Sequence, residues 1–334
     1  MKLAVLFLVT SLVARAVEPL QLSWPTPNTA WVDGKPLEAY IQHAGSGDPE
    51  SGTFGGVRSG GHQFHEGIDI KCVSRDRRGE PIDDVFAAMD GVVRHVNGHA
   101  GDSNYGRYIV LEHPEQSPGV YTLYAHLSRI APGLRAGDHV RRGQVIATMG
   151  HSSDRPIPRD RAHLHFEIGV MVTQNFNVWY ARKGFGSPNE QGLWNGMNLM
   201  GIDPLFVFNG WRAGRFKTMQ DIFTALTPAA RVRIASHLVP DFVQRYPSLV
   251  MVPIPLGGPA AWEIQFNWTG VPFAWRPLTA AEAVGLAANN PIVIDANGDI
   301  ERHERSKSLV VRRGSGWIVS RDLETVLQQL FGIR

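Results

Sequence analysis

The stretch HLHFEI at residues 163–168 alternates polar and apolar side chains. Side chains two residues apart share a face only in an extended strand, whereas on a helix they point to nearly opposite sides. The two histidines and Glu167 would therefore line one face of a strand, with Leu164, Phe166 and Ile168 on the other. This alternation predicts a half-buried β-strand with one apolar face toward a core.

A second pair of polar residues, His65 and Asp69, lies in the stretch HEGIDI at residues 65–70. A spacing of four places both side chains on one face of either a helix or a strand, so the spacing alone leaves both open. Gly67 and the β-branched residues Ile68 and Ile70 favour extended chain.

These residues have the chemistry of a mononuclear zinc hydrolase. Zinc takes imidazole nitrogen and carboxylate oxygen in a tetrahedron, and a catalytic site keeps three protein ligands with the fourth position open for water. His65, Asp69 and His165 would supply the three ligands for one zinc ion per chain. His126 and His163 are then available for general acid–base chemistry and for stabilising an oxyanion.

Four blocks of sequence extend this pattern. They are HQFHEGIDI at 62–70, AMDGVV at 88–93, YTLYAHL at 121–127, and GDHVRRGQVIA at 137–147 leading into HLHFE at 163–167. In this order the blocks resemble the lysostaphin-type zinc peptidases, which cut peptide cross-links in bacterial peptidoglycan. The resemblance covers roughly residues 54 to 170.

The resemblance implies a role for each of the five residues. His65, Asp69 and His165 match the zinc ligands of that family, while His126 and His163 match its catalytic histidine pair. A lone histidine on a strand is more often an ordinary surface or core residue, so the assignment depends on five positions matching in one register. The family match leaves out His62, which is near the ligand pair in sequence and stays open, and the histidines at 95, 99, 113, 139 and 151.

The chain is expected to be mainly β: an antiparallel β-sheet metallopeptidase domain with a groove at residues 54–207, plus a smaller C-terminal α+β module at 208–334. Short alternating segments predict strands in the first, and residues 17–53 look like an extended lead-in. In the second, helices are expected to begin after Thr218, Thr227, Thr279 and Ser320. The predicted strands are 85–88, 92–96, 108–112, 121–126, 144–148, 291–294, 309–311 and 317–319.

Two segments depart from the family pattern. The loop 153–161 carries three arginines and two aspartates and is expected to border the groove, either facing charged stem peptides or forming a solvated turn. The stretch 173–200 is expected to wall one end of the groove. Three tryptophans at 262, 268 and 275 could stack on glycan or belong to a core.

Alternative functions are poorly supported by the residues. The segment 137–147 also resembles a turn of biotinyl and lipoyl carrier domains, but the corresponding hairpin has Asp90 where a carrier requires lysine. Asp295, Asn297 and Asp299 suggest calcium, but glycine occupies the fourth rather than the sixth position, which favours a plain turn. The net charge of +2 gives no general affinity for nucleic acid.

The N-terminus predicts export. Lys2, an apolar run and Ala14-Arg15-Ala16 form a signal peptide at residues 1–16, and the run is too short for a stable membrane anchor. We expect a periplasmic or extracellular protein. Cys72 is the only cysteine, so no intramolecular disulfide forms, and a buried structural role is favoured over metal ligation.

The expected function is a secreted zinc-dependent endopeptidase that acts on peptidoglycan peptides by metal-activated water. Activity should fall in acid as the neutral base titrates near pH ~6.5. The alternative is an inactive or latent wall-binding or regulatory protein that activates a partner hydrolase. Blocking by the lead-in or the C-terminal module predicts that truncation to about residues 50–210 raises activity. The sequence does not decide which bond is cut, which of His126 and His163 is the general base, or what the oligomeric state is.

Overall fold

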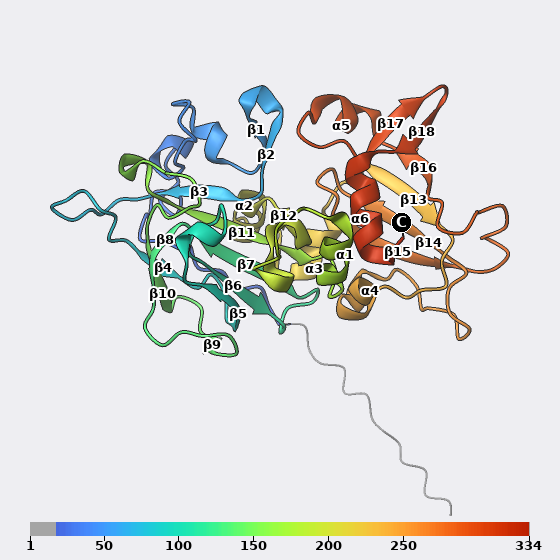
Figure 1. Cartoon of the computed structure of the whole chain (residues 1–334), viewed down its shortest axis with the longest axis horizontal. Coiled ribbons are helices and arrows are strands. Elements are labelled where there is room, and N and C mark those ends of the chain that lie inside the picture. Colours follow the sequence, from blue (N-terminus) through green and yellow to red (C-terminus); the bar gives the residue numbers. More distant parts are fainter. Residues whose placement is uncertain (1–17, 334) are drawn as a thin grey trace, which may run out of the picture.

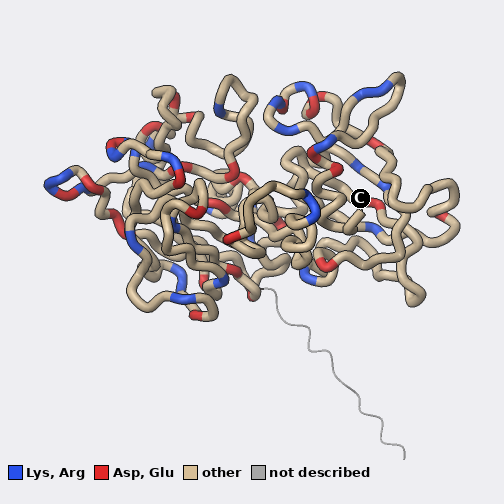
Figure 2. Tube along the Cα trace, viewed as in Figure 1, with Lys and Arg blue, Asp and Glu red and all other residues tan. Residues whose placement is uncertain are grey.

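Antiparallel strands dominate the computed structural model, which describes residues 18–333 (Figure 1). The predicted signal peptide, residues 1–16, lies outside the described residues. None of the helices within 18–333 has the length and apolar character needed to cross a bilayer. Basic and acidic residues are interspersed along the trace (Figure 2), in keeping with the small net charge.

The central feature is a seven-stranded antiparallel sheet in the order β12-β11-β7-β6-β5-β9, with β3 also paired to β11. Strand β11 pairs with β3 through its first half and with β12 through its second half, and β7 flanks it on the other side. The strands are β3 (Ile68–Lys71), β5 (Gly91–Asn97), β6 (Tyr108–His113), β7 (Val120–Ala125), β9 (His139–Val140), β11 (His163–Met171) and β12 (Leu199–Ile202).

Two smaller sheets, the helix α1 and seven 3₁₀ turns complete this half of the molecule within residues 18–333. A three-stranded sheet has the order β4-β10-β8, and β1 and β2 form a hairpin that leads directly into the β3 segment. The elements are β1 (Gly55–Arg58), β2 (Gln63–His65), β4 (Asp84–Phe86), β8 (Leu127–Ile130), β10 (Val145–Met149), α1 (Phe176–Lys183), and the 3₁₀ turns η1 (Leu37–Ala39), η2 (Pro49–Gly52), η3 (Ser59–Gly61), η4 (Ala100–Asp102), η5 (Arg159–Arg161), η6 (Gly192–Trp194) and η7 (Gly196–Asn198).

The C-terminal part is α+β, as expected. A four-stranded sheet has the order β15-β14-β13-β16, β17 and β18 form a hairpin, and α6 lies between this sheet and α1 (Figure 1). The predicted boundary at 207/208 falls inside α2. The elements are α2 (Pro204–Arg212), α3 (Met219–Thr224), β13 (Ala230–Ile234), α4 (Asp241–Arg245), η8 (Pro247–Leu249), β14 (Ala261–Phe266), β15 (Pro272–Leu278), β16 (Ile292–Ala296), α5 (Gly298–His303), β17 (Val310–Arg313), β18 (Gly316–Val319) and α6 (Arg321–Phe331).

The fold class predicted from the sequence is confirmed, and the predicted strands occur within a few residues of their expected bounds. Two of the four predicted helix starts are correct: Thr218 caps α3 with a full capping box, and Ser320 precedes α6. The other two are wrong. The chain after Thr227 enters β13 directly, and the Thr279 pattern forms only a turn, where the Glu282 carboxylate accepts from the Thr279 amide and from Arg276.

The segment 18–53 is more than an extended lead-in. It contributes no named strand, as its lack of periodicity predicted, but it buries apolar side chains in the main core, including Leu20 and Leu22. Trp24 stacks on Trp31 with ring centroids 4.9 Å apart, and both meet the ring of Phe208 edge-on. Burial of these large side chains makes the segment part of the folded unit.

Strand β11 is buried on both faces, so the prediction of a half-buried strand was wrong. Its apolar face joins the main core through Leu164, Phe166 and Ile168. Its polar face is covered by a second cluster that includes Tyr105 and Tyr121. The polar side chains of this face bond to one another and to these tyrosines, which compensates for the loss of water.

Of the two roles that the sequence left open for the C-terminal tryptophans, stacking on glycan is excluded for two of them. Trp262 and Trp275 are completely buried and pack edge-on against each other. Trp268 is partly buried and contacts Phe54 and Phe64, the residues around the β1–β2 hairpin. All three belong to the packing of the core. Cys72 is likewise buried, as predicted.

Candidate metal centre

Three predicted ligands converge at the junction of β2, β3 and β11. The antiparallel register places His165 of β11 directly opposite Asp69 of β3, and His65 ends β2 just before the turn into β3. All three side chains are buried. The His65 Nε2 and His165 Nδ1 atoms lie 3.0 Å apart, and each lies 3.1 Å from Asp69 Oδ1.

This triangle fits the donor set of a zinc ion. Ligand atoms of a tetrahedral zinc with bonds of about 2.0–2.1 Å lie about 3.3 Å apart, close to the separations observed here. Among residues 18–333, these three form the one His/Cys/Asp/Glu group whose ligand atoms are close enough together to hold a metal. Two imidazoles and one carboxylate are also the ligand types that zinc prefers in catalytic sites.

Hydrogen bonds fix the orientation of both histidine ligands. His65 Nδ1 donates to the carbonyl of Thr53 at 2.7 Å, which leaves Nε2 for a metal. His165 Nε2 donates to Glu167 at 3.0 Å, which leaves Nδ1. The Glu167 carboxylate accepts further hydrogen bonds from the hydroxyls of Tyr105 at 2.6 Å and Tyr121 at 2.7 Å. Such outer partners set the tautomer and basicity of metal-binding imidazoles.

The third ligand is held by an arginine. Arg58 donates from its guanidinium to Asp69 Oδ2 at 2.6 Å, so the other oxygen, Oδ1, faces the two histidines. Burial raises the pKa of Asp69, but the charges and hydrogen bonds of the surrounding histidines outweigh burial and hold it well below its usual range. The carboxylate is therefore ionised, as a metal ligand must be.

The catalytic histidine pair predicted from the sequence adjoins this triangle. The rings of His126 and His163 lie 4.9 Å apart between centroids in an edge-on arrangement. His126 Nδ1 donates to the carbonyl of Ser152 at 2.8 Å, and His163 Nδ1 donates to the carbonyl of Arg161 at 2.7 Å. In the neutral form, each histidine then has an Nε2 lone pair without a backbone partner.

His126 has a strained backbone. Its φ of 61° lies in the left-handed region, which a residue with a side chain rarely adopts and which costs on the order of 1–3 kcal/mol. The residue sits between β7 and β8, where the chain leaves the central sheet. Such strain is commonly retained at functional sites because it aims a side chain.

The pKa values of the five residues are shifted by burial and by one another. Burial lowers the pKa of His126 well below its ordinary value, helped by His163 and His165, and burial also lowers the pKa of His163. Both imidazoles thus stay neutral at more acid pH than the ~6.5 expected from the sequence. Burial also lowers the pKa of His165, but hydrogen bonds to Asp69 and Glu167 raise it to about 9, so metal binding there displaces a proton.

A cavity of about 300 Å³ contains these groups. The loop 153–161 borders it through Arg155, Ile157 and Arg161, as predicted, whereas Arg159 is paired with Glu80 outside it. His62, left open by the sequence, is exposed and does not line the cavity.

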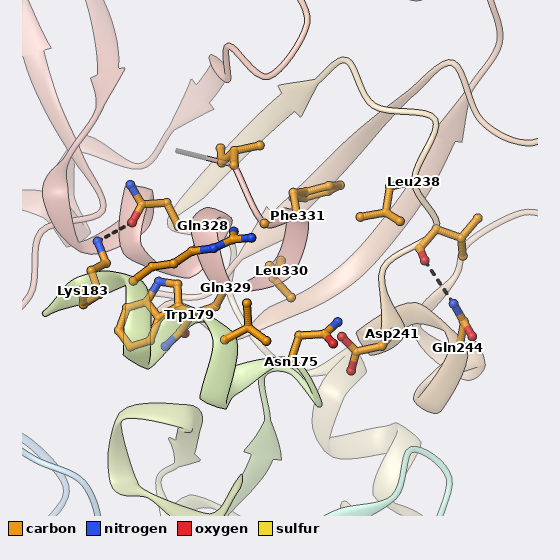
Figure 3. A pocket seen from close by; sticks show the side chains of 15 residues that line it. Asn175, Trp179, Lys183, Leu238, Asp241, Gln244, Gln328, Gln329, Leu330 and Phe331 are labelled. Atoms are coloured by element: carbon orange, nitrogen blue, oxygen red, sulfur yellow. Dashed lines mark hydrogen bonds between the residues drawn. The ribbon is translucent and has the colours of Figure 1, made fainter. Parts of the chain in front are cut away.

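The two ends of the segment 173–200 line two different cavities. Its helix α1 lines a separate cavity of about 810 Å³ against α6, where Lys183 donates to Gln328 at 2.5 Å (Figure 3). This cavity shares no lining residue with the metal centre. Residues 191–200 instead line a cleft that adjoins the metal centre, so only this part walls the groove as predicted.

Sequence reasoning missed Arg58, Tyr105 and Tyr121. Tyr105 lies 62 residues from its partner Glu167, and no local spacing connects the two. Glu167 was placed correctly on the histidine face of its strand, but its role in orienting His165 became visible only from the contacts.

Comparisons with solved structures give several similar chains. LytM from Ruminococcus gnavus ATCC 29149 is 30% identical over 32% of this chain and 39% of that chain, with a TM-score of 0.26. A zinc-containing peptidase from Vibrio cholerae is 25% identical over 45% of this chain and 33% of that chain, with a TM-score of 0.25. The catalytic domain of the antimicrobial peptidase lysostaphin from Staphylococcus simulans is 23% identical over 34% of this chain and 70% of that chain, with a TM-score of 0.24.

The chain thus spans about two fifths and one third of the lengths of the first two proteins. Because the TM-scores are this low, these structural similarities carry no argument about the function of this chain. None of the curated proteins compared with the chain matches it. Residues 63–177 match peptidase family M23, and this range includes all five predicted site residues. The chain therefore carries a peptidase family M23 domain at residues 63–177.

Proposed function

We propose that this protein is an exported, zinc-dependent endopeptidase that hydrolyses amide bonds in peptidoglycan stem peptides or cross-bridges. The observation that supports this most directly is the triangle of His65, Asp69 and His165 donor atoms beside two further histidines, all within the M23 segment. The peptidoglycan substrate follows from the family resemblance, and export follows from the predicted signal peptide.

The residues around the site have different roles in amide hydrolysis. His65, Asp69 and His165 would hold a zinc ion, which when bound would polarise the scissile carbonyl and lower the pKa of a bound water toward about 7. One of His126 and His163 would accept the proton of the attacking water at its Nε2 lone pair. The other would donate a hydrogen bond to the tetrahedral oxyanion from Nε2 only in its protonated form, because its Nδ1–H is already donated to a backbone carbonyl. The Ser152 and Arg161 carbonyls fix the two rings for this task.

The alternative of a latent or regulatory protein has one observation in its favour. His43 and Ala44, from the segment before β1, line the metal cavity. Arg58, whose guanidinium donates to Asp69, lines the same cavity. A regulatory protein of this kind would bind peptidoglycan without cutting it.

The deciding experiment is peptide release from purified peptidoglycan, with products identified by mass spectrometry. His126→Ala and His163→Ala should each abolish release while retaining zinc, because neither residue is among the three ligands. His139→Ala is the matched control, since His139 is exposed on β9 and outside the cavity. Zinc retained with no cleavage by the unaltered protein would favour the regulatory alternative.

A further inference from the structure

A second cleft continues the metal cavity toward the C-terminal module. It has a volume of about 820 Å³, and its lining includes Glu66, Asn104, Tyr105 and Arg155, which also line the metal cavity. The two spaces therefore adjoin at these four residues. A volume of this size is in the range of sites that hold ligands much larger than a water molecule.

The far wall of the cleft comes from the C-terminal module. Residues Ser306 and Lys307, before β17, and Asp322 and Gln329, on α6, line it opposite the segment 191–200. Gln329 also donates to the carbonyl of Met197 at 2.9 Å and so ties the two walls together. The module is therefore placed to contact any peptide that extends along the groove from the metal centre.

Lys307 is the notable side chain in this wall. Its ammonium donates to the carbonyl of Thr269 at 3.2 Å and lies 4.1 Å from the centre of the Phe64 ring. Within residues 18–333, no carboxylate oxygen lies within ion-pairing distance of this ammonium. Glu66, Asp322 and Glu167 act on it only at longer range.

This arrangement leaves Lys307 able to bind an anion. An ammonium group has three donors, of which the structure uses one for the Thr269 carbonyl. A cation withdrawn from water is stabilised most by a directly bonded counter-charge. The Asp322 carboxylate accepts from the amide of Ser308 at 3.0 Å and forms no ion pair with Lys307. Arg155, at the junction of the two spaces, also forms no ion pair among the described residues.

We propose that the cleft binds the peptide flanking the scissile amide and that Lys307 pairs with a free carboxylate of that peptide. This inference rests on the proposed function, because peptidoglycan stem peptides carry free carboxylates beside their amide bonds. It gives the C-terminal module a role in substrate selection. Peptides in which that carboxylate is amidated should therefore be poorer substrates.

The test compares two forms of the protein on two forms of the substrate. The full zinc-loaded protein and its Lys307→Gln variant are compared on a cross-linked stem-peptide dimer with free carboxylates and on the same dimer with those groups amidated. Lys307→Gln should raise KM about tenfold on the free acid and leave KM on the amidated dimer unchanged. Lys307→Arg should restore the preference for the free acid, because it restores the charge.

Two controls distinguish an effect of Lys307 on substrate binding from a general effect of the substitution on the folded structure. Lys35→Gln, at an exposed lysine outside the cleft, should behave as the unaltered protein on both substrates. Zinc content is measured in all variants, because Phe64, which contacts Lys307, precedes the ligand His65; equal zinc content shows that the change in KM does not arise from loss of metal. An equal loss on both substrates by Lys307→Gln would show a structural role and overturn the inference.

The outcome also separates this inference from the proposed function. If the unaltered protein cleaves neither dimer, the proposed function fails, and equilibrium binding of the same two peptides then decides the inference. Tighter binding of the free acid that is lost in Lys307→Gln would support the carboxylate site. Equal binding of both peptides would overturn it.

Discussion

At the scale of single residues, the site depends on hydrogen bonds outside the metal ligands. Glu167 is buried, and its two carboxylate oxygens accept from His165 and from two tyrosine hydroxyls, whereas a glutamine would keep only one accepting oxygen for these three donors. Glu167→Gln introduces an amide donor where donors already converge. We predict a zinc affinity lower by about 10–100-fold, measured by competition with a chelator. Glu112→Gln, whose carboxylate pairs with Arg94 away from the site, is the control, and equal affinities would contradict the prediction.

A second residue-scale prediction concerns His113. Burial lowers the pKa of this side chain to about 4, and its Nδ1 donates to the carbonyl of Asp90 at 2.7 Å. The unfolded chain, with a histidine pKa near ~6.5, binds this proton more readily than the folded protein. Above pH 6.5, His113 is neutral in both states and does not change the free energy of unfolding. As pH falls from 6.5 toward 4, protonation of the unfolded chain should lower the free energy of unfolding by up to about 3 kcal/mol.

The measurement for His113 is urea unfolding at pH 7 and at pH 5. His113→Gln removes the titrating group, so the variant should lose less free energy of unfolding between the two pH values than the unaltered protein, whatever its stability at pH 7. An identical loss in the two proteins would show that His113 does not titrate in this range.

The five site residues were predicted from the sequence because they lie in short blocks whose spacing is physically specific. The alternation at 163–167 requires a strand, and the structure has that strand. Arg58, Tyr105 and Tyr121 could not be predicted in the same way. Their contacts with Asp69 and Glu167 depend on which strands and loops the tertiary fold brings together, and no local pattern encodes such a tertiary choice.

At the scale of elements, the register of β3 on β11 positions the ligands, and Gly67 permits it. A Cβ at this glycine would lie 2.3 Å from the backbone oxygen of Phe166, so the two segments would have to separate. We predict that Gly67→Ala destabilises the fold by about 1–3 kcal/mol and weakens zinc binding, because His65 and Asp69 flank the glycine.

Gly98 offers a matched control for this prediction. A Cβ there would meet no atom within 4 Å, so Gly98→Ala should leave both stability and zinc binding nearly unchanged. Thermal unfolding and zinc titration of the two variants make the comparison. Equal effects of the two substitutions would show that the β3–β11 contact does not position the ligands.

The elements also show where sequence patterns fail. The capping pattern at Thr218 is followed by a helix with three buried residues, whereas the similar pattern at Thr279 precedes an exposed segment. A cap alone does not stabilise a helix without an apolar face to bury. The strand prediction for β11 was right in type but not in burial, because the tyrosines that cover its polar face come from distant parts of the chain.

At the scale of the whole molecule, the segment before β1 and the M23 segment share one core. Trp24, Trp31 and Phe208 pack together, and Phe208 also contacts Phe166 of β11. Burial of a large apolar side chain contributes about 1.5–3 kcal/mol, so losing several such side chains approaches the total stability of a domain.

Truncation to about residues 50–210 should therefore unfold the protein rather than relieve a block. We predict that this fragment lacks the cooperative thermal unfolding of the full chain and has lower activity, with circular dichroism as the measurement. A fragment with an unchanged melting temperature and raised activity would instead establish latency through the missing segments.

The central claim is that a single zinc ion held by His65, Asp69 and His165 drives hydrolysis of peptidoglycan peptides. The most direct measurement titrates zinc into chelator-treated full-length protein while recording bound metal and the rate of peptide release together. We predict no release without metal and a rate that saturates at about one zinc per chain, with both responses lost in Asp69→Ala. Release that persists without metal, or a protein that binds no zinc, would contradict it.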